Sequence, residues 1–144
     1  MKAYTDLEQS KKLAEILPIE SADIILTLEG NSELTSYPIM RNYSEFYNYL
    51  RIFELEEEYI KHTYIPAWSL AALFSVLPII YTNDKKEVCG PLHIDITDSE
   101  TPFVLWYVNP LHKGCIVELK TKECDNLVDA CYEMINKLHE QKLL

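Results

Sequence analysis

Hydrophobic residues recur with a helical period in the first and last parts of the chain. Residues 6–17 are predicted to form a helix that stops before Pro18, with Thr5 and Glu8 as a capping box at its start. Asp125 is the predicted N-cap of a longer helix, in which the apolar residues recur at helical spacing. That apolar stripe consists of Leu127, Cys131, Met134, Ile135 and Leu138.

A period of two predicts strands between these helices. Residues 24–28 alternate before a Gly30-Asn31 turn, and residues 92–96 alternate between apolar and polar side chains. Residues 103–108 are apolar on both faces, which is typical of a central strand. In residues 115–120 the pattern places Cys115, Val117 and Leu119 on one face. We predict an α+β fold, with an antiparallel sheet of three to five strands and helices packed mainly on one face.

Residues 63–83 carry no charged side chain and are long enough to cross a membrane. Pro66 suits a first helical turn and Pro78 stops a helix, which leaves about 12 residues or roughly 18 Å. We therefore predict no membrane span but a core helix, continued by a strand over residues 79–81. Trp68, Ala72 and Ser75 lie opposite its core stripe and are the predicted contact surface for a partner.

The pattern is ambiguous between residues 29 and 62. Residues 44–61 have helical spacing, Ser44 is a possible cap, and four glutamates follow within residues 54–58. These glutamates form either an acidic site or, more simply, a solvated helix face. The chain also has ten tyrosines, many between Tyr37 and Tyr81. They indicate either a contact surface, including a possible homo-oligomer, or a half-exposed sheet and helix surface.

The 144 residues suggest one globular domain, residues 1–144. The net charge of −10 repels phosphate, so we expect neither a nucleic-acid partner nor binding to anionic lipid. Mimicry of the charge of DNA is an alternative that the same net charge allows. The N-terminal residues do not have the pattern of a signal peptide, and we therefore expect a cytoplasmic protein with reduced cysteines.

Four side chains have the right chemistry for a Cys2His2 zinc site: Cys89, His93, His112 and Cys115. Residues four apart on a strand lie roughly 13 Å apart, too far to share one ion unless the Gly90-Pro91 step folds the chain back. Cys124 precedes a helix, but acidic neighbours oppose a reactive thiolate. Nucleophile and phosphate-binding motifs are absent, so no catalytic residue and no cofactor is predicted.

Three segments together resemble small uncharacterised proteins of phages, prophages and other mobile elements of gut Bacteroides-type bacteria. They are LPIESAD (residues 17–23), IPAWSLAALFSVLP (65–78) and DNLVDACYEMINKLHEQ (125–141). The three blocks occur in the same order in those proteins, and residues 24–64 show no resemblance to them. It implies a setting and a cytoplasmic location but no activity and no functional residue.

Three functions are compatible with these observations. The first is a non-enzymatic accessory protein that acts through protein–protein contacts, as the missing motifs and the many tyrosines suggest. The second is a small hydrolase or other enzyme that uses a Cys/His/carboxylate site. The third is a structural zinc protein.

Overall fold

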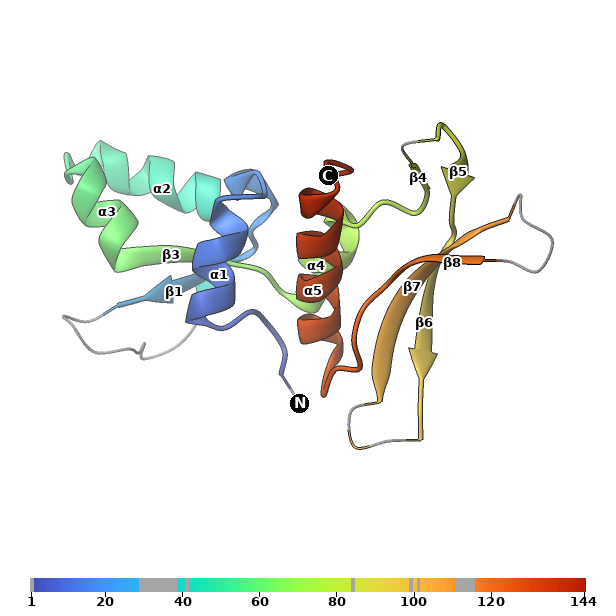
Figure 1. Ribbon diagram of the computed structural model, residues 1–144. Helices are drawn as coiled ribbons and strands as arrows, with labels where there is room; N and C mark the ends of the chain where they lie inside the picture. The colour runs from blue at the N-terminus through green and yellow to red at the C-terminus, as the bar shows by residue number, and fades with distance from the viewer. Residues whose placement is uncertain are drawn as a thin grey trace. The chain divides into compact units, whose positions relative to one another are not determined.

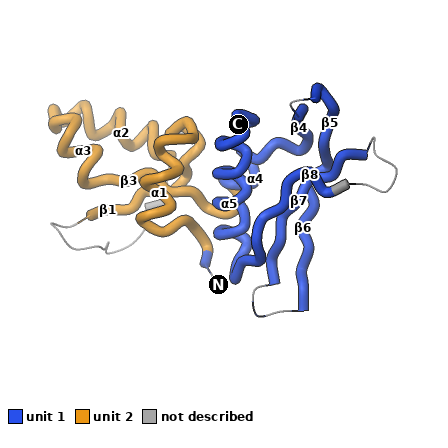
Figure 2. The backbone as a smooth tube through the Cα atoms, viewed as in Figure 1, with its two compact units in different colours: residues 1–2, 73–144 blue, residues 3–72 orange. Residues whose placement is uncertain are grey.

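The structure is a computed structural model that describes residues 2–28, 39–40, 42–83, 85–98, 100, 102–110 and 116–144 (Figure 1). The chain consists of two compact units (Figure 2). Unit 1 contains residues 1–2 and 73–144, and unit 2 contains residues 3–72. Both units combine helices with antiparallel strands, which confirms the α+β class. A single sheet of three to five strands is not confirmed, because the described strands fall into separate sheets.

Unit 2 is built on a small sheet in the order β2-β1-β3, with β1 in the centre. The buried side chains Ile24, Leu26, Ile65 and Ala67 form its core. The elements of the unit are α1 (Leu7–Ala14), the 3₁₀ helix η1 (Ile19–Ser21), β1 (Ile24–Thr27), β2 (Ile39–Met40), α2 (Tyr43–Ile52), α3 (Glu57–Thr63), β3 (Tyr64–Ala67) and the start of α4 (Leu70–Val76).

Pro66 lies in a strand and not at the start of a helix, so that part of the prediction is wrong. In β3 it is opposite Ile25 of β1. Among the described strands, β3 pairs with β1 alone. The missing N–H of Pro66 therefore interrupts no hydrogen bonds to a second neighbouring strand. The central helix begins only at Leu70, where Ser69 caps it by accepting from the N–H of Ala72.

The first helix also begins differently from the prediction. Asp6, and not Thr5, is the N-cap, and its carboxylate accepts from the N–H of Gln9 at 2.9 Å. The side chain of Gln9 accepts in return from the N–H of Asp6, which completes the capping box. Thr5 is instead buried and its hydroxyl lies 2.7 Å from that of Ser10.

Trp68 joins three segments of unit 2. Its backbone N–H donates to the hydroxyl of Thr5 at 3.1 Å, and its indole N–H donates to the hydroxyl of Ser21 at 2.9 Å. Next to it, the backbone N–H and hydroxyl of Ser69 both donate to the carboxylate of Asp23. Polar side chains therefore tie the N-terminal segment, η1 and the end of β3 together.

Unit 1 is organised around the sheet β6-β7-β8, with β7 central as predicted. Helix α5 packs against β7 (Figure 1). Tyr107 of β7 is fully buried, and its hydroxyl donates to the carbonyl oxygen of Pro78. The elements of the unit are the rest of α4, β4 (Tyr81–Thr82), β5 (Val88–Cys89), β6 (Leu92–Ile96), β7 (Phe103–Asn109), β8 (Ile116–Lys120) and α5 (Leu127–Glu140).

Two details of unit 1 differ from the sequence pattern. The N-cap of α5 is Asn126, whose side chain accepts from the N–H of Asp129, and not Asp125. In β8, the register skips Glu118 between Tyr107 and Val108 of the neighbouring strand. Such a bulge reverses which face the following side chains occupy, so Leu119 is buried while Val117 is 46% exposed.

Residues 63–83, which carry no charged side chain, form the separate short elements β3, α4 and β4. The predicted strand over residues 79–81 begins only at Tyr81, and Ile79 and Ile80 are exposed. Within the described ranges, no helix has both the length and the apolar character that crossing a membrane requires.

Replacement of the two tryptophans by phenylalanine tests the role of the Trp68 hydrogen bond. Trp68→Phe should lower the free energy of unfolding by about 1–3 kcal/mol, because it removes a buried hydrogen bond and part of a buried ring. Trp106→Phe is the matched control, since the buried Nε1 of Trp106 has no hydrogen-bond partner in the described chain. Urea unfolding followed by circular dichroism should show the smaller loss for Trp106→Phe. Equal losses would contradict this assignment.

Gly90 occupies a backbone conformation that no larger residue fits. Its φ is +144°, and an added Cβ would lie 2.6 Å from Cγ2 of Ile80 and 2.9 Å from the carbonyl oxygen of Ile79. Gly90→Ala should therefore reduce the stability by about 2 kcal/mol or more, measured by urea unfolding. Combining it with Ile80→Ala should recover only part of the loss, because the Ile79 oxygen and the φ angle remain. Full recovery would show that only the Ile80 side chain excludes alanine.

Candidate functional site

Four large apolar side chains are exposed close to the turn between α2 and α3. Tyr49, Ile52 and Phe53 follow one another along α2 and its C-cap, and Tyr59 belongs to α3. Their exposed fractions are 46%, 76%, 60% and 53%. The rings of Tyr49 and Phe53 meet edge to face, with their centroids 5.0 Å apart. We call these four residues the aromatic surface.

Helix α2 is apolar on its inner side as well. Tyr43 and Leu50 are buried, and the ring of Phe46 meets that of Tyr64 edge to face at 5.2 Å. A surface helix of a monomeric protein normally has one apolar face, which covers the core. The apolar side chains of α2 and its C-cap thus extend beyond the part of the helix that is buried, and the aromatic surface is the exposed part.

Acidic side chains border the aromatic surface. Glu54, Glu56 and Glu58 are exposed, and none forms an ion pair with another described residue. A shallow hollow of about 310 Å³ lies among Glu54, Leu55, Glu56 and Tyr59. The glutamates of this segment are solvated, in agreement with the simpler of the two predictions for them.

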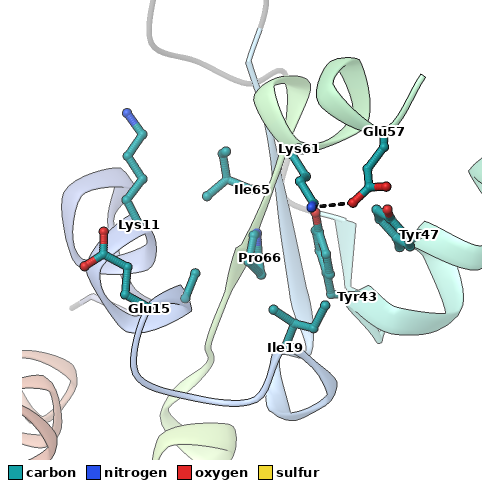
Figure 3. A pocket seen from close by; sticks show the side chains of 10 residues that line it. Lys11, Glu15, Ile19, Tyr43, Tyr47, Glu57, Lys61, Ile65 and Pro66 are labelled. Carbon is teal, nitrogen blue, oxygen red and sulfur yellow. Dashed lines mark hydrogen bonds and ion pairs between the residues drawn. The ribbon is translucent and has the colours of Figure 1, made fainter. Parts of the chain in front are cut away.

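A pocket of about 610 Å³ lies elsewhere in unit 2, over β3 and between α1 and the helices α2 and α3 (Figure 3). Its floor consists of Ile65 and Pro66 of β3, both buried. Ala14 of α1 and Ile19 of η1 extend the apolar lining. Volume and lining are those of pockets that hold small ligands or single side chains.

Charged side chains lie at the rim of this pocket. Glu57 and Lys61 of α3 form an ion pair one helical turn apart, and Arg51 of α2 lies 3.7 Å from the same carboxylate. The hydrogen bond and the opposite charges of this pair lower the pKa of Glu57 and raise the pKa of Lys61. Lys11 and Glu15 of α1 occupy the opposite rim (Figure 3).

Tyr43 forms the wall of the pocket that faces α1. Its hydroxyl donates to the carbonyl oxygen of Tyr64 at 2.8 Å, and its ring stacks on that of Tyr47 with centroids 6.3 Å apart. Burial, and to a smaller extent Tyr47, raise the pKa of Tyr43 to about 12. The phenol is therefore neutral at physiological pH and serves as a hydrogen-bond donor, not as a base.

The predicted zinc ligands fall only partly within the described residues. The thiol of Cys89 is buried, and burial raises its pKa. His93 stacks on Trp106, with centroids 4.2 Å apart. His112 and Cys115 lie outside the described residues. In the part of the chain that the structure describes, no three His, Cys, Asp or Glu side chains are arranged to hold a metal ion.

The predicted contact residues of the central segment differ in exposure. Trp68 is fully buried and Ala72 is 8% exposed, whereas Ser75 is exposed. Cys124 precedes α5 as expected, but burial, and next Glu133, raise the pKa of its thiol. The pocket was not predicted. Of the aromatic surface, only the tyrosines were anticipated, because a contact surface was one of the two interpretations of the many tyrosines between Tyr37 and Tyr81.

A scan against protein-family models finds no match for this chain. Searches of curated proteins and of solved structures find none either. The resemblance to proteins of phages and mobile elements therefore stays a prediction.

The raised pKa of Tyr43 predicts a loss of stability at high pH. An unfolded tyrosine titrates near pH 10, so the folded state retains the proton to higher pH. This contribution is complete below about pH 10 and is lost as the pH rises through about 12. Tyr43→Phe should cost about 1 kcal/mol at neutral pH through the lost hydrogen bond, and should flatten the decline between these values. Urea unfolding at several pH values measures both effects, and an unchanged decline would contradict the assignment.

Proposed function

We propose that this chain is a non-enzymatic accessory protein of phage or mobile-element origin that binds another protein in the cytoplasm. The aromatic surface is the proposed contact. The observation that carries the proposal is that the apolar residues of α2 and its C-cap extend beyond the buried part of the helix and leave Ile52 76% and Phe53 60% exposed. Exposed apolar patches with a polar rim are typical of protein contact sites, and aromatic residues are enriched at them.

The charge of the rim indicates the chemistry of the partner. Glu54 and Glu56 lie around one hollow with Tyr59, Glu58 is exposed next to Tyr59 in the sequence, and the whole chain has a net charge of −10. A second copy bound through the same surface would bring two acidic rims together, which is unfavourable. We therefore propose a partner segment that combines apolar anchors with lysine or arginine, and a homo-oligomer is the alternative that the test includes.

The enzyme and zinc hypotheses receive no comparable support. The pocket over β3 is lined by neither histidine nor cysteine. Burial keeps the described thiols of Cys124 and Cys131 in the protonated form, which is the less nucleophilic one.

Synthetic peptides test the proposed contact. A leucine–lysine peptide patterned as an amphipathic helix should bind the wild-type protein, and the corresponding leucine–glutamate peptide should not. Ile52→Ser or Phe53→Ser should weaken binding roughly tenfold, as expected when a buried apolar anchor is lost. Fluorescence anisotropy of labelled peptide measures the affinity.

Ile79→Ser is the matched control, because Ile79 and Ile52 are both 76% exposed. It should leave peptide binding unchanged. Sedimentation velocity of the same variants tests the alternative. If the wild-type protein is a dimer and Phe53→Ser dissociates it, the partner is a second copy of this chain and not a basic segment. Equal binding of both peptides would contradict the charge argument.

A further inference from the structure

The pocket over β3 is a second site that the aromatic surface does not explain. It lies on the inner side of α2, whereas Tyr49, Ile52 and Phe53 lie on the outer side. Its apolar floor and the ring of Tyr43 offer a surface for an apolar group, and the volume of about 610 Å³ accommodates more than a single methyl or water.

The polar groups of the pocket are not equally available to a ligand. The hydroxyl of Tyr43 already donates to Tyr64, and the carboxylate of Glu57 is shared by Lys61 and Arg51. An ammonium group has three donors, and Lys61 uses one of them for Glu57. Lys11 has no ion pair with another described residue. Figure 3 shows the ammonium of Lys61 above the pocket wall and Lys11 on the facing helix.

Two of the charged residues that line the pocket are cationic, Lys11 and Lys61, and two are carboxylates, Glu15 and Glu57. Arg51 does not line the pocket but lies 3.7 Å from Glu57, so that Lys61 and Arg51 together carry one more positive charge than the carboxylate that they share. This local excess contrasts with the net charge of −10 for the whole chain. A ligand that fits has an apolar body and one negative group at its end.

We propose that this pocket binds a small amphipathic carboxylate. The apolar body lies on Ile65 and Pro66, between Ala14 and Tyr43, and the carboxylate accepts hydrogen bonds from Lys61 and, across the mouth, from Lys11. The ammonium groups supply charge-assisted hydrogen bonds, and the apolar floor excludes ligands that are charged throughout.

Octanoate, octanamide and octylamine are suitable probes, because they share the apolar chain and differ in the charge at its end. Titration followed by methyl NMR shifts of Ala14, Ile19 and Ile65 should give saturable binding of octanoate. Octanamide should bind several-fold more weakly, and octylamine should be the weakest. Equal binding of octanoate and octylamine, or no saturable shift with octanoate, would overturn the proposal.

Four substitutions and one control substitution separate the carboxylate site from a non-specific apolar hollow. Lys61→Gln should weaken octanoate binding roughly three- to tenfold, since it removes a charged donor. Lys11→Gln removes the proposed second donor and should also weaken binding. Its control is Lys12→Gln, at the neighbouring position of α1, which should have no effect. Glu57→Gln should strengthen binding, because it releases Lys61 from its internal partner. Ala14→Leu should abolish binding by filling the pocket.

The variants also keep this proposal separate from the proposed protein contact. Ile52→Ser, which removes an anchor of the aromatic surface, should leave octanoate binding unchanged. Weakened octanoate binding after Glu57→Gln, or unchanged binding after Ala14→Leu, would overturn the assignment of the pocket even where the peptide experiment succeeds.

Discussion

Burial of Trp68 with both of its N–H groups satisfied is the interaction on which unit 2 depends. The backbone N–H and the indole N–H reach Thr5 and Ser21, which lie 63 and 47 residues away along the chain. A buried donor without a partner would cost roughly 1–3 kcal/mol, so these two hydroxyls select the fold of the segments that carry them. Ile65 and Pro66 of the pocket floor are close to this interaction along the chain, because Ala67 ends β3 and Trp68 follows it directly.

Helix α2 has two functions in this arrangement. Its inner side contacts Tyr64 of β3 through Tyr43 and Phe46, and it forms one wall of the pocket through Tyr43 and Tyr47. Its outer side presents Tyr49, Ile52 and Phe53. Arg51 and Glu57 connect the end of α2 to α3, so the turn that separates the two helices also positions Tyr59 and the acidic rim. One two-sided helix thus accounts for both candidate sites.

The sequence predicted the regular parts of the fold well where one period dominated. The strands over residues 92–96 and 103–108 and the last helix are found, because alternation and a single apolar stripe are local signals. Pro66 was misplaced because proline is compatible with both a first helical turn and an edge strand, and only the pairing with Ile25 decides between them. The bulge at Glu118 is likewise a property of the strand pair and not of β8 alone.

The candidate sites could not be predicted for a different reason. A pocket depends on which helices meet over which strand, and Lys11, Tyr43 and Lys61 lie far apart in the sequence. The spacing of the apolar residues predicts the helix but does not tell which of them the core covers, so the exposure of Tyr49, Ile52 and Phe53 is seen only in the structure. Since burial keeps Tyr43 protonated and the ion pair with Lys61 lowers the pKa of Glu57, neither side chain is an activated base.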